Sequence, residues 1–310
     1  MKHTFLSLTA ILTVAFGLAL VGCGGATMDG PPLNSRATSS STMPQSKHVV
    51  IVMEENRSYS SVVGDTSAWP HLNALIGKGA LAKHYYANTH PSIGNYFMLT
   101  TGKILTNNDN SRTVWNVDNI ARRMLAAHVS FRIYAEGIKQ GYVGGNTGLY
   151  VIRHNPFAML SDIADNKAVA YAHIWPFSQF ATDVAKGALP EYSFIVPNVD
   201  DDGHNGTSLQ ADTWLQSKVI SPLSTRPAFK TGGDGFLVVN FDEAADSDTT
   251  HGGGHVAAVM WGPIVKAGYK QTSSTVYQHQ SMLRTEMELL RLSNPPAAAA
   301  TAPLMSEFFR

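Results

Sequence analysis

Short apolar runs of the buried-strand type alternate along this chain with segments of helical periodicity. The strand-type runs are His48–Met53, Leu81–Ala87, Phe131–Tyr134, Tyr192–Val196, Phe236–Phe241 and Val256–Trp261. The helical segments are Trp69–Gly77, Ile93–Thr101, Val117–His128, Ser208–Ile220 and His279–Leu292. Alternating strands and helices predict an α/β fold, with a mostly parallel central sheet that helices cover on both faces.

Residues 1–22 have the pattern of an export signal. Lys2 and His3 precede the uncharged apolar run Phe5–Val21, which is short for a membrane span. The run ends in Leu20-Val21-Gly22-Cys23, which resembles a bacterial lipoprotein signal with Cys23 as the lipidated first residue. The alternative is an ordinary signal peptide with an incidental cysteine.

The resemblance predicts an exported lipoprotein of the cell envelope, held at the membrane through Cys23. In a Gram-negative host this places it at the outer membrane or in the periplasm. Residues 23–46 are rich in Gly, Ser, Thr and Pro and predict a flexible tether. Residues 47–310 contain no internal repeat and no change of composition, so we expect them to form a single domain.

Composition excludes several classes of protein. Apolar residues make up 44% of the chain, which rules out wholesale disorder. The 23 basic and 23 acidic residues balance, so there is no electrostatic case for nucleic acid as a partner. Cys23 is the only cysteine, which excludes an internal disulfide and a zinc site built from cysteines.

Polar side chains follow most of the expected strands, at the edge where parallel sheets bind their ligands. They are Glu54, Glu55 and Asn56 after the first strand, Thr89, His90 and Ser92 after the second, and Asp200, Asp201, Asp202 and His204 after the strand ending at Val196. Asp242 and Glu243 follow the strand ending at Phe241, and His255 precedes the strand at Val256. Polar residues at so many separate strand ends indicate a binding or catalytic site rather than ordinary solvent-exposed loops.

Ser92 stands at the start of a predicted helix. A serine there can simply cap the helix. The same position also places its hydroxyl among free backbone N–H groups, which suit a phosphate. A serine hydroxyl needs a base or a metal to act as a nucleophile. Asp, Glu, Asn and His at the other strand ends favour a divalent cation with hard or borderline character, whose identity the sequence leaves open.

The motifs resemble the bacterial phosphoesterase family of the alkaline phosphatase superfamily, which includes acid phosphatases and phospholipases C. The matching blocks are Val49–Tyr59, His90–Tyr96, Arg153–Phe157, Pro197–His204, Phe241–Glu243 and Gly253–Val256, in the family's order. The resemblance spans essentially all of the expected domain, 47–310, as a phosphoesterase catalytic domain. One departure is Asp201-Asp202-Gly203-His204, where the family more often has Asn-Asp-Met-His.

The resemblance implies a role for each matching residue. Ser92 would be the nucleophile, with His154 and His204 as further catalytic residues, and Asn95 and His90 would contact the substrate phosphate. The implied metal ligands are Glu55, Asn56, Asp242, Glu243, Asp202 and His255. Glu54 is the alternative to Glu55 as the first ligand, and the departure at residues 201–204 leaves the number of metals open.

The expected function is metal-dependent hydrolysis of phosphate monoesters, of the acid phosphatase type. The alternatives are a phospholipase C or other phosphodiesterase on the same scaffold, and a catalytically dead lipoprotein that binds ligands at the cell surface. A binding protein has no need of a nucleophile at a helix start, which disfavours the last alternative. The expected substrate is a phosphorylated small molecule or a lipid head group, and the sequence does not indicate an oligomeric state.

Overall fold

The computed structural model describes residues 43–310. The predicted signal segment 1–22, the proposed lipidation site Cys23 and most of the predicted tether lie outside the described residues. Between residues 43 and 310, no helix combines the length and apolarity that a membrane span requires.

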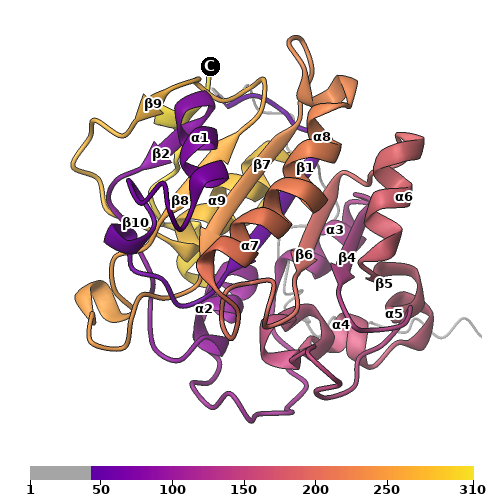
Figure 1. The fold of residues 1–310 in the computed structure, drawn as a ribbon. Coiled ribbons are helices and arrows are strands. Elements are labelled where there is room, and N and C mark those ends of the chain that lie inside the picture. Colours follow the sequence, from indigo (N-terminus) through magenta and orange to yellow (C-terminus); the bar gives the residue numbers. More distant parts are fainter. Residues whose placement is uncertain (1–42) are drawn as a thin grey trace, which may run out of the picture. The chain divides into compact units, whose positions relative to one another are not determined.

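An eight-stranded sheet forms the centre of the described domain (Figure 1). Its order is β5 (Ile174–Pro176), β4 (Phe131–Ala135), β6 (Tyr192–Val196), β1 (Val49–Glu54), β7 (Phe236–Phe241), β8 (Ala258–Trp261), β2 (Ala80–Ala82) and β9 (Tyr269–Lys270). Within this sheet, β8 alone runs against the others, as its antiparallel pairing with β7 and β2 shows. The predicted α/β fold with a mostly parallel sheet is confirmed.

Strand β1 lies at the centre because its sequence suits a position covered on both sides. All six residues, Val49–Glu54, are buried, and four of them are Val or Ile. Branched side chains favour extended backbone, and a run without polar alternation requires cover on both faces. β1 accordingly pairs in parallel with β6 on one side and β7 on the other.

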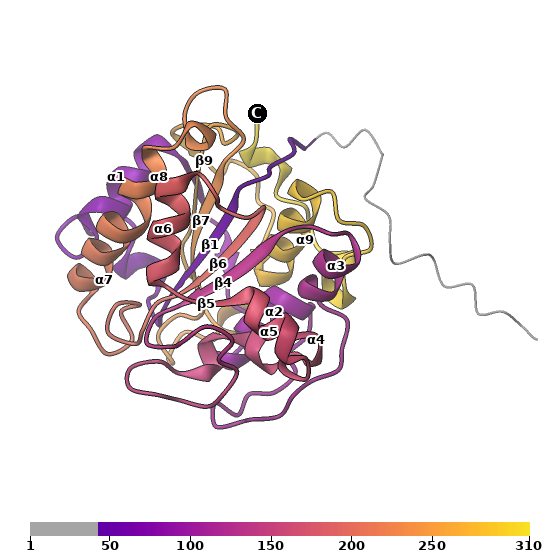
Figure 2. The ribbon, with the colours of Figure 1, turned by 90° about the vertical axis from the view of Figure 1, so that its right-hand side faces the viewer.

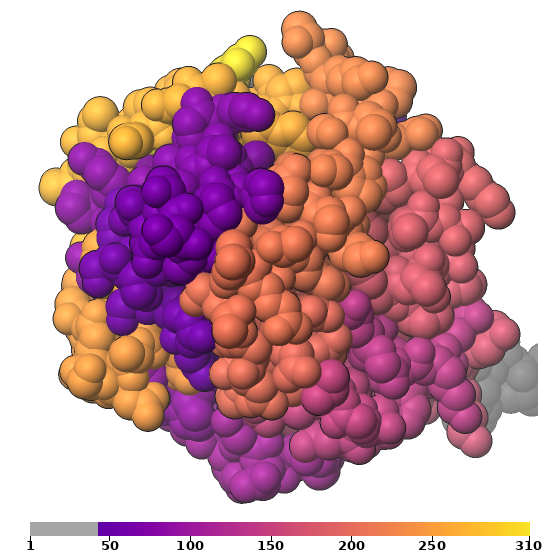
Figure 3. Space-filling view, in the orientation of Figure 1, coloured from indigo at the N-terminus to yellow at the C-terminus, as the bar shows by residue number. Residues whose placement is uncertain are grey.

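Helices cover both faces of the sheet (Figure 2). On one side lie α1 (Pro70–Lys78), α6 (Ser178–Lys186), α7 (Ser208–Trp214) and α8 (Ser221–Ser224), and on the other α2 (Ile93–Thr101), α3 (Ile120–Ala126) and α9 (His279–Leu289). The short helices α4 (Ser161–Ala164) and α5 (Lys167–His173) continue the chain towards β5. Figure 3 shows that atoms of the first of these helix layers close over the sheet on the face it displays.

Some predicted boundaries were wrong. The expected strand Leu81–Ala87 is two strands, because the ladder of β2 with β8 ends at Ala82. Beyond it, β3 (Tyr85–Tyr86) pairs with β10 (Tyr277–Gln278) in a separate small sheet. The helix expected at Val117 begins at Ile120 because the Asn119 side chain caps it, accepting a hydrogen bond from Arg122 N.

The reversed direction of β8 brings its start to the edge where the other strands end. The segments after β1, β6 and β7 and the segment before β8 therefore meet on one side of the sheet. Backbone hydrogen bonds tie these segments together: Glu55 N donates to Asp202 O (2.9 Å), and Asp242 N donates to Glu54 O (3.1 Å). The sheet thus gathers the predicted site residues from distant parts of the chain.

We predict that Glu286→Gln stabilises the protein, and more at pH 8 than at pH 5. Glu286 of α9 is fully buried, and its Oε2 accepts a hydrogen bond from the Tyr192 hydroxyl (3.2 Å). Burial raises the pKa of Glu286 well above its usual value, so the folded state holds a proton that the unfolded chain releases as pH rises. Stability is therefore lost from the unfolded pKa upwards, and a neutral glutamine removes this loss.

Thermal unfolding at several pH values measures the effect. A gain of about 1 kcal/mol corresponds to about 2–4 °C in Tm for a domain of this size. Glu288→Gln is the matched control, since Glu288 lies on the same helix but is partly exposed beside Arg291. A Glu286→Gln protein whose Tm difference from wild type is the same at both pH values contradicts the prediction.

Candidate active site

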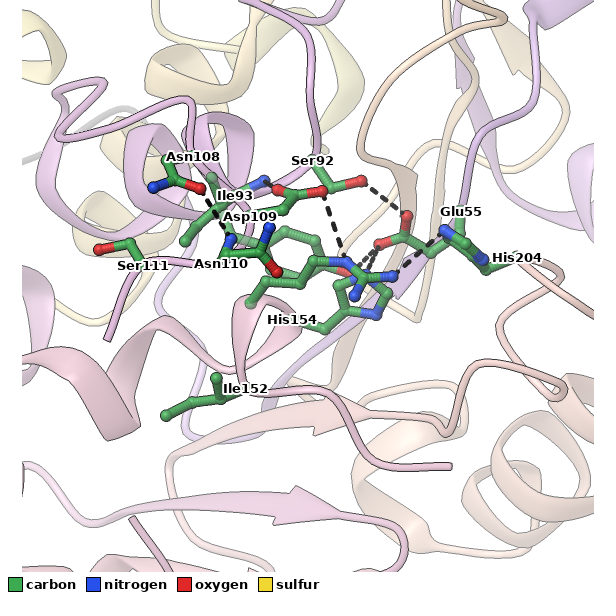
Figure 4. Close-up of polar contacts among 12 residues, drawn as sticks. Glu55, Ser92, Ile93, Asn108, Asp109, Asn110, Ser111, Ile152, His154 and His204 are labelled. Atoms are coloured by element: carbon green, nitrogen blue, oxygen red, sulfur yellow. Dashed lines mark hydrogen bonds and ion pairs between the residues drawn. The ribbon is translucent and has the colours of Figure 1, made fainter. Parts of the chain in front are cut away.

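Ser92 precedes helix α2, but its hydroxyl does not cap that helix. Its backbone is helical (φ −41°, ψ −51°), and its side chain makes no capping hydrogen bond to the amides of α2. The Oγ atom instead donates to Glu55 Oε2 (3.0 Å) and lies 3.2 Å from Glu243 Oε1. Figure 4 shows the contact with Glu55. The geometry favours a chemical role over the capping alternative.

Carboxylates surround the Ser92 hydroxyl at short distances. A hydroxyl carries one proton and can donate to only one of Glu55 and Glu243 at a time. Asp242 comes next to Glu243 and is fully buried, and its Oδ1 accepts a hydrogen bond from Asn56 N (3.1 Å). Within residues 43–310, Asp242 Oδ2 and Asn56 Oδ1 are buried oxygens without a hydrogen-bond partner. The site therefore presents more oxygen acceptors than the described residues supply with donors.

The pKa values of these carboxyls show that burial and crowding disfavour their charged forms. Burial, followed by the charge of Asp242, raises the pKa of Glu55 well above its usual value. The same two causes raise the pKa of Glu243 to about 9. Burial also raises the pKa of Asp242. Carboxyls in such surroundings need protons or a cation, and a bound cation favours their charged form.

These observations fit a divalent cation. The donor set of Glu55, Asn56, Asp242 and Glu243 consists of buried oxygens, which hard cations prefer. Two of the buried oxygens without hydrogen-bond partners, Asn56 Oδ1 and Asp242 Oδ2, belong to this set. Glu54, the alternative first ligand, is also buried, and both of its carboxylate oxygens lack a hydrogen-bond partner. Burial, followed by the charges of Asp202 and of Asp212 in α7, raises its pKa well above the usual value. The contact of Glu55 with Ser92 favours Glu55.

His154 lies beneath Glu55 rather than in the open part of the site. It is 1% exposed, with Nε2 3.2 Å from Glu55 Oε1 and Nδ1 3.1 Å from Asp202 Oδ2. Burial lowers the pKa of His154 to about 3, so the ring is neutral. Burial raises the pKa of Asp202 to about 7. His154 thereby joins two of the predicted ligands, and these three side chains form one group with metal-binding potential.

His90, Glu243 and Asp246 form a second group whose donor atoms could hold a metal. His90 Nδ1 lies 2.8 Å from Glu243 Oε2, and Nε2 lies 3.0 Å from the Asp248 carbonyl oxygen. Both ring nitrogens of His90 therefore contact protein atoms. Asp246 is exposed, and the sequence argument gave it no role.

Other predicted residues have different surroundings. The Asn95 side chain holds the loop before Ser92: its Oδ1 accepts from Asn88 N and Thr89 N, and its Nδ2 donates to Thr89 O. A phosphate contact would require it to leave these bonds. His255 stacks on Tyr59 with ring centroids 4.2 Å apart, and its Nε2 lies 2.8 Å from Lys83 O.

His204 lies on the more exposed side of the site. Its ring centroid is 6.0 Å from that of His154, and its Nε2 lies 3.2 Å from Arg153 Nη2. Because a guanidinium can only donate, His204 accepts through Nε2 and carries its proton on Nδ1, next to Asn205 Oδ1 (2.9 Å).

Besides Asp246, three residues that contact the site were not among the predicted ones. The Tyr96 hydroxyl donates to Glu55 Oε1. Its position four residues after Ser92, on the same face of one helix, is a signal that could have identified it. Arg153 precedes His154 within a matched block, so only its neighbour received a role. Asp109 comes from a segment without any motif, and nothing in its surroundings along the chain marks it.

Comparison with known proteins identifies the family. The model of the Phosphoesterase family matches residues 65–291. This chain belongs to the Phosphoesterase family. It is 31% identical over 270 residues to a phosphatidylinositol-3-phosphatase of Mycobacterium tuberculosis, covering 86% of this chain and 84% of that protein. The predicted family is therefore confirmed, and the chain is a phosphoric ester hydrolase.

Fungal acid phosphatases are also similar. A probable acid phosphatase of Kluyveromyces lactis is 30% identical over 76% of this chain, and a phosphate-repressible acid phosphatase of Penicillium chrysogenum is 30% identical over 69%. The matches span 56% and 52% of those proteins, so the chain corresponds to about half of each.

Solved structures support the fold. A protein of the alkaline phosphatase superfamily from Vibrio parahaemolyticus matches 84% of this chain and 71% of its own, with a TM-score of 0.54 and 13% identity. The lipoteichoic acid synthase LtaP from Listeria monocytogenes matches 83% of this chain and 76% of its own, with a TM-score of 0.53 and 8% identity. The predicted alkaline-phosphatase-like architecture is confirmed.

We predict that chelation lowers the Tm of this phosphoesterase and that added divalent cation restores it. A cation relieves the repulsion among the buried carboxylates, and a ligand at about 100 times its Kd adds about 2.7 kcal/mol. That corresponds to a rise of about 5–10 °C for a domain of this size. Thermal unfolding of chelated and reloaded protein measures the response without any assay of activity.

Asp242→Asn should lose most of this response, because it removes one charge from the donor set. Asp234→Asn is the matched control: Asp234 pairs with His48 (2.9 Å), which precedes the opposite end of β1. Equal Tm values with and without divalent cation, for wild type and both variants, contradict a metal site here.

Proposed function

We propose that this phosphoesterase hydrolyses phosphate monoesters with Ser92 as its nucleophile and a divalent cation at Glu55, Asn56, Asp242 and Glu243. The observation that carries the proposal is the Ser92 hydroxyl, which stands at a helix start, makes no capping bond and contacts two buried carboxylates. When bound, the cation lowers the pKa of the hydroxyl and neutralises charge on the phosphoryl group. A purely structural serine has no need of these surroundings.

In the proposed reaction, Ser92 Oγ attacks phosphorus in line with the leaving ester oxygen. The serine proton passes to a carboxylate, for which Glu55 Oε2 at 3.0 Å is the nearest acceptor. The ester oxygen leaves with the bonding electrons, and a phosphoserine forms. Water then attacks that phosphorus, and the Ser92 oxygen takes back a proton as free phosphate is released.

The leaving oxygen needs a proton, and among the histidines considered His204 is the best-placed donor. It can donate only as an imidazolium, so its Nε2 first has to leave Arg153 Nη2 and take up a proton from solvent. His154, the other predicted catalytic residue, is buried between Glu55 and Asp202: its Nδ1 is hydrogen-bonded to Asp202, and its Nε2 lies 3.2 Å from Glu55 Oε1 without a hydrogen bond. His204 is partly exposed, at the side from which a substrate can approach. We propose that His154 orients Glu55 and that His204 serves the leaving group.

Lipid head-group phosphates are the second substrate class within this proposal. The similar Mycobacterium tuberculosis protein is named a phosphatidylinositol-3-phosphatase, and the match covers most of both chains. The fungal relatives are named acid phosphatases, without a stated substrate. These names favour monoesters over the diester cleaved by a phospholipase C, which is the remaining alternative.

We predict that Ser92→Ala lowers turnover of p-nitrophenyl phosphate and phosphatidylinositol 3-phosphate by roughly 10³–10⁶-fold, as removal of other serine nucleophiles does. Wild type should act poorly on bis-p-nitrophenyl phosphate and phosphatidylcholine, and chelation should abolish its activity. Because two in-line displacements restore configuration, a chiral phosphate should be transferred with retention.

Asn166→Ala is the matched control for helix capping. Asn166 caps α5, accepting from Ala168 N and Val169 N, so its loss should lower stability by about 1 kcal/mol and leave turnover intact. Inversion at phosphorus, or a Ser92→Ala protein with near wild-type turnover, would show that water attacks directly. Preference for the diesters would instead favour the phospholipase C alternative.

We also propose that the protein is exported and anchored to the cell envelope through a lipid on Cys23. Support comes from the apolar run before Gly22-Cys23 and from the absence of any other cysteine in the sequence. We predict that Cys23→Ser leaves the precursor unprocessed or the mature protein unattached. Membrane fractionation and the mass of the mature N-terminus check this, and identical fractionation of both forms without a lipid mass contradicts it.

A further inference from the structure

The segment between α2 and α3 runs from residue 102 to residue 119 without a regular helix or strand and carries an acidic residue into the site. Asp109 Oδ1 accepts a hydrogen bond from the backbone N–H of Ile93 (3.3 Å), the residue directly after the proposed nucleophile. Its Oδ2 lies 3.6 Å from Arg153 Nε. Figure 4 shows the Asp109 carboxylate beside Ser92 and Ile93. An anion therefore lies beside the proposed nucleophile.

We propose that the Asp109 carboxylate holds the place of a phosphoryl oxygen between the Ile93 N–H and the Arg153 guanidinium, and that the substrate phosphoryl group displaces it. This inference rests on the proposed function of the same site. It assigns Arg153 as a residue that binds the phosphoryl group and Asp109 as its internal competitor. Neither residue belongs to the sets of possible metal ligands around Ser92.

The Arg153 side chain is poorly satisfied by its present partners. Its Nε is buried and has no hydrogen-bond partner among the described residues, because the 3.6 Å to Asp109 is too long for one. Its Nη2 donates to His204 Nε2 (3.2 Å), a neutral acceptor. An unpaired buried donor on a charged group is costly, and a phosphoryl oxygen would relieve that cost.

The Asp109 contacts are weak ones. The hydrogen bond from Ile93 N is longer than the usual 2.9–3.0 Å, and the side chain of Asp109 is 31% exposed. Ile93 is the first residue of α2, whose N-terminal amides favour an anion. A carboxylate can occupy this place in the absence of substrate, and a phosphoryl group with more charge and three free oxygens can replace it.

The neighbouring part of the segment is hydrogen-bonded to the loop before α2, so displacement of Asp109 does not require the whole segment to leave. Asn107 Nδ2 donates to Thr89 Oγ1 (2.9 Å). A Cβ atom on Gly94 would lie only 2.4 Å from Asn107 Oδ1, so glycine at this position lets the segment approach the first turn of α2. The Asp109 side chain, two residues further along, is 31% exposed, so it can turn towards solvent once its contacts with Ile93 and Arg153 break.

Binding of inorganic phosphate tests the inference apart from catalysis. The protein is loaded with divalent cation and carries Ser92→Ala, so that no turnover occurs, and calorimetry measures the Kd of phosphate. Asp109→Asn keeps an oxygen that can accept from Ile93 N but removes the competing charge. We expect it to lower the Kd by roughly two- to fivefold, the range for breaking one partly exposed ion pair. Arg153→Met should raise the Kd, and Asp109→Asn should then have little further effect.

Asp118→Asn is the matched control. Asp118 pairs with Arg123, and the exposed fractions of the two side chains, 38% and 12%, resemble the 31% and 16% of Asp109 and Arg153. This variant should leave the Kd of phosphate unchanged. In the background that retains Ser92, Asp109→Asn should lower KM for p-nitrophenyl phosphate, and added phosphate should inhibit it more strongly than wild type.

An unchanged or higher Kd in Asp109→Asn, or an unchanged Kd in Arg153→Met, overturns the inference. These results are distinguishable from failure of the proposed function. If hydrolysis depends on Ser92 while Asp109→Asn binds phosphate like wild type, the proposed function holds and the inference fails. If Asp109→Asn tightens phosphate binding in a protein that hydrolyses no phosphate ester, the inference holds and the proposed function fails.

Discussion

The crowding of buried carboxylates around one serine hydroxyl is the constraint on which the rest of this site depends. Glu55, Asp242 and Glu243 are each buried, and burial raises the pKa of all three. Like charges cannot stay together in a medium of low polarity without compensation. A divalent cation would supply that compensation, and the same cation could activate the serine. The electrostatic cost of the carboxylate cluster and its proposed chemical use would then have one origin.

The sheet explains how such an unfavourable cluster is held in place. Glu55 follows β1 and Asp242 follows β7, and these strands pair in register over the whole length of β1, from Val49 with Phe236 to Glu54 with Phe241. The apolar burial of both strands thus fixes the distance between two groups that repel each other. The strand pattern in the sequence predicted that these acidic residues lie together at the strand ends, because each apolar run ends where its acidic residues begin. It could not predict that β8 runs in reverse or that β2 and β3 belong to different sheets, since pairing partners are set by tertiary contacts.

The sequence predicted the site residues unevenly, for physical reasons. Residues at the ends of long strands, such as Glu55 and Asp242, could be placed because the topology brings strand ends together. The direction in which a single side chain points could not be predicted. The family resemblance suggested a phosphate contact for Asn95, whose amide instead bonds to the backbone of residues 88 and 89. Glu54 and Glu55 are adjacent in sequence, and only the alternation of side chains along β1 separates them. The role of Asp109 could not be predicted, because a segment without hydrophobic periodicity gives no indication of where in the fold it lies.

Charge balance then decides how a phosphate can enter a site made of acids. The carboxylates nearest Ser92 repel a phosphate dianion as long as they remain uncompensated, so protons or a cation have to neutralise them before a phosphate can bind. In the inference above, Arg153 and the first amides of α2 provide the remaining attraction. Asp109 lies among these groups, and its charge keeps the guanidinium from being wholly unpaired when no substrate is present. To displace the Asp109 carboxylate, a substrate phosphoryl group has to carry more charge and make better hydrogen bonds to Arg153 and the Ile93 N–H than that carboxylate does. A dianionic monoester does so more readily than a singly charged diester, so the proposed displacement of Asp109 agrees with the proposed monoesterase activity.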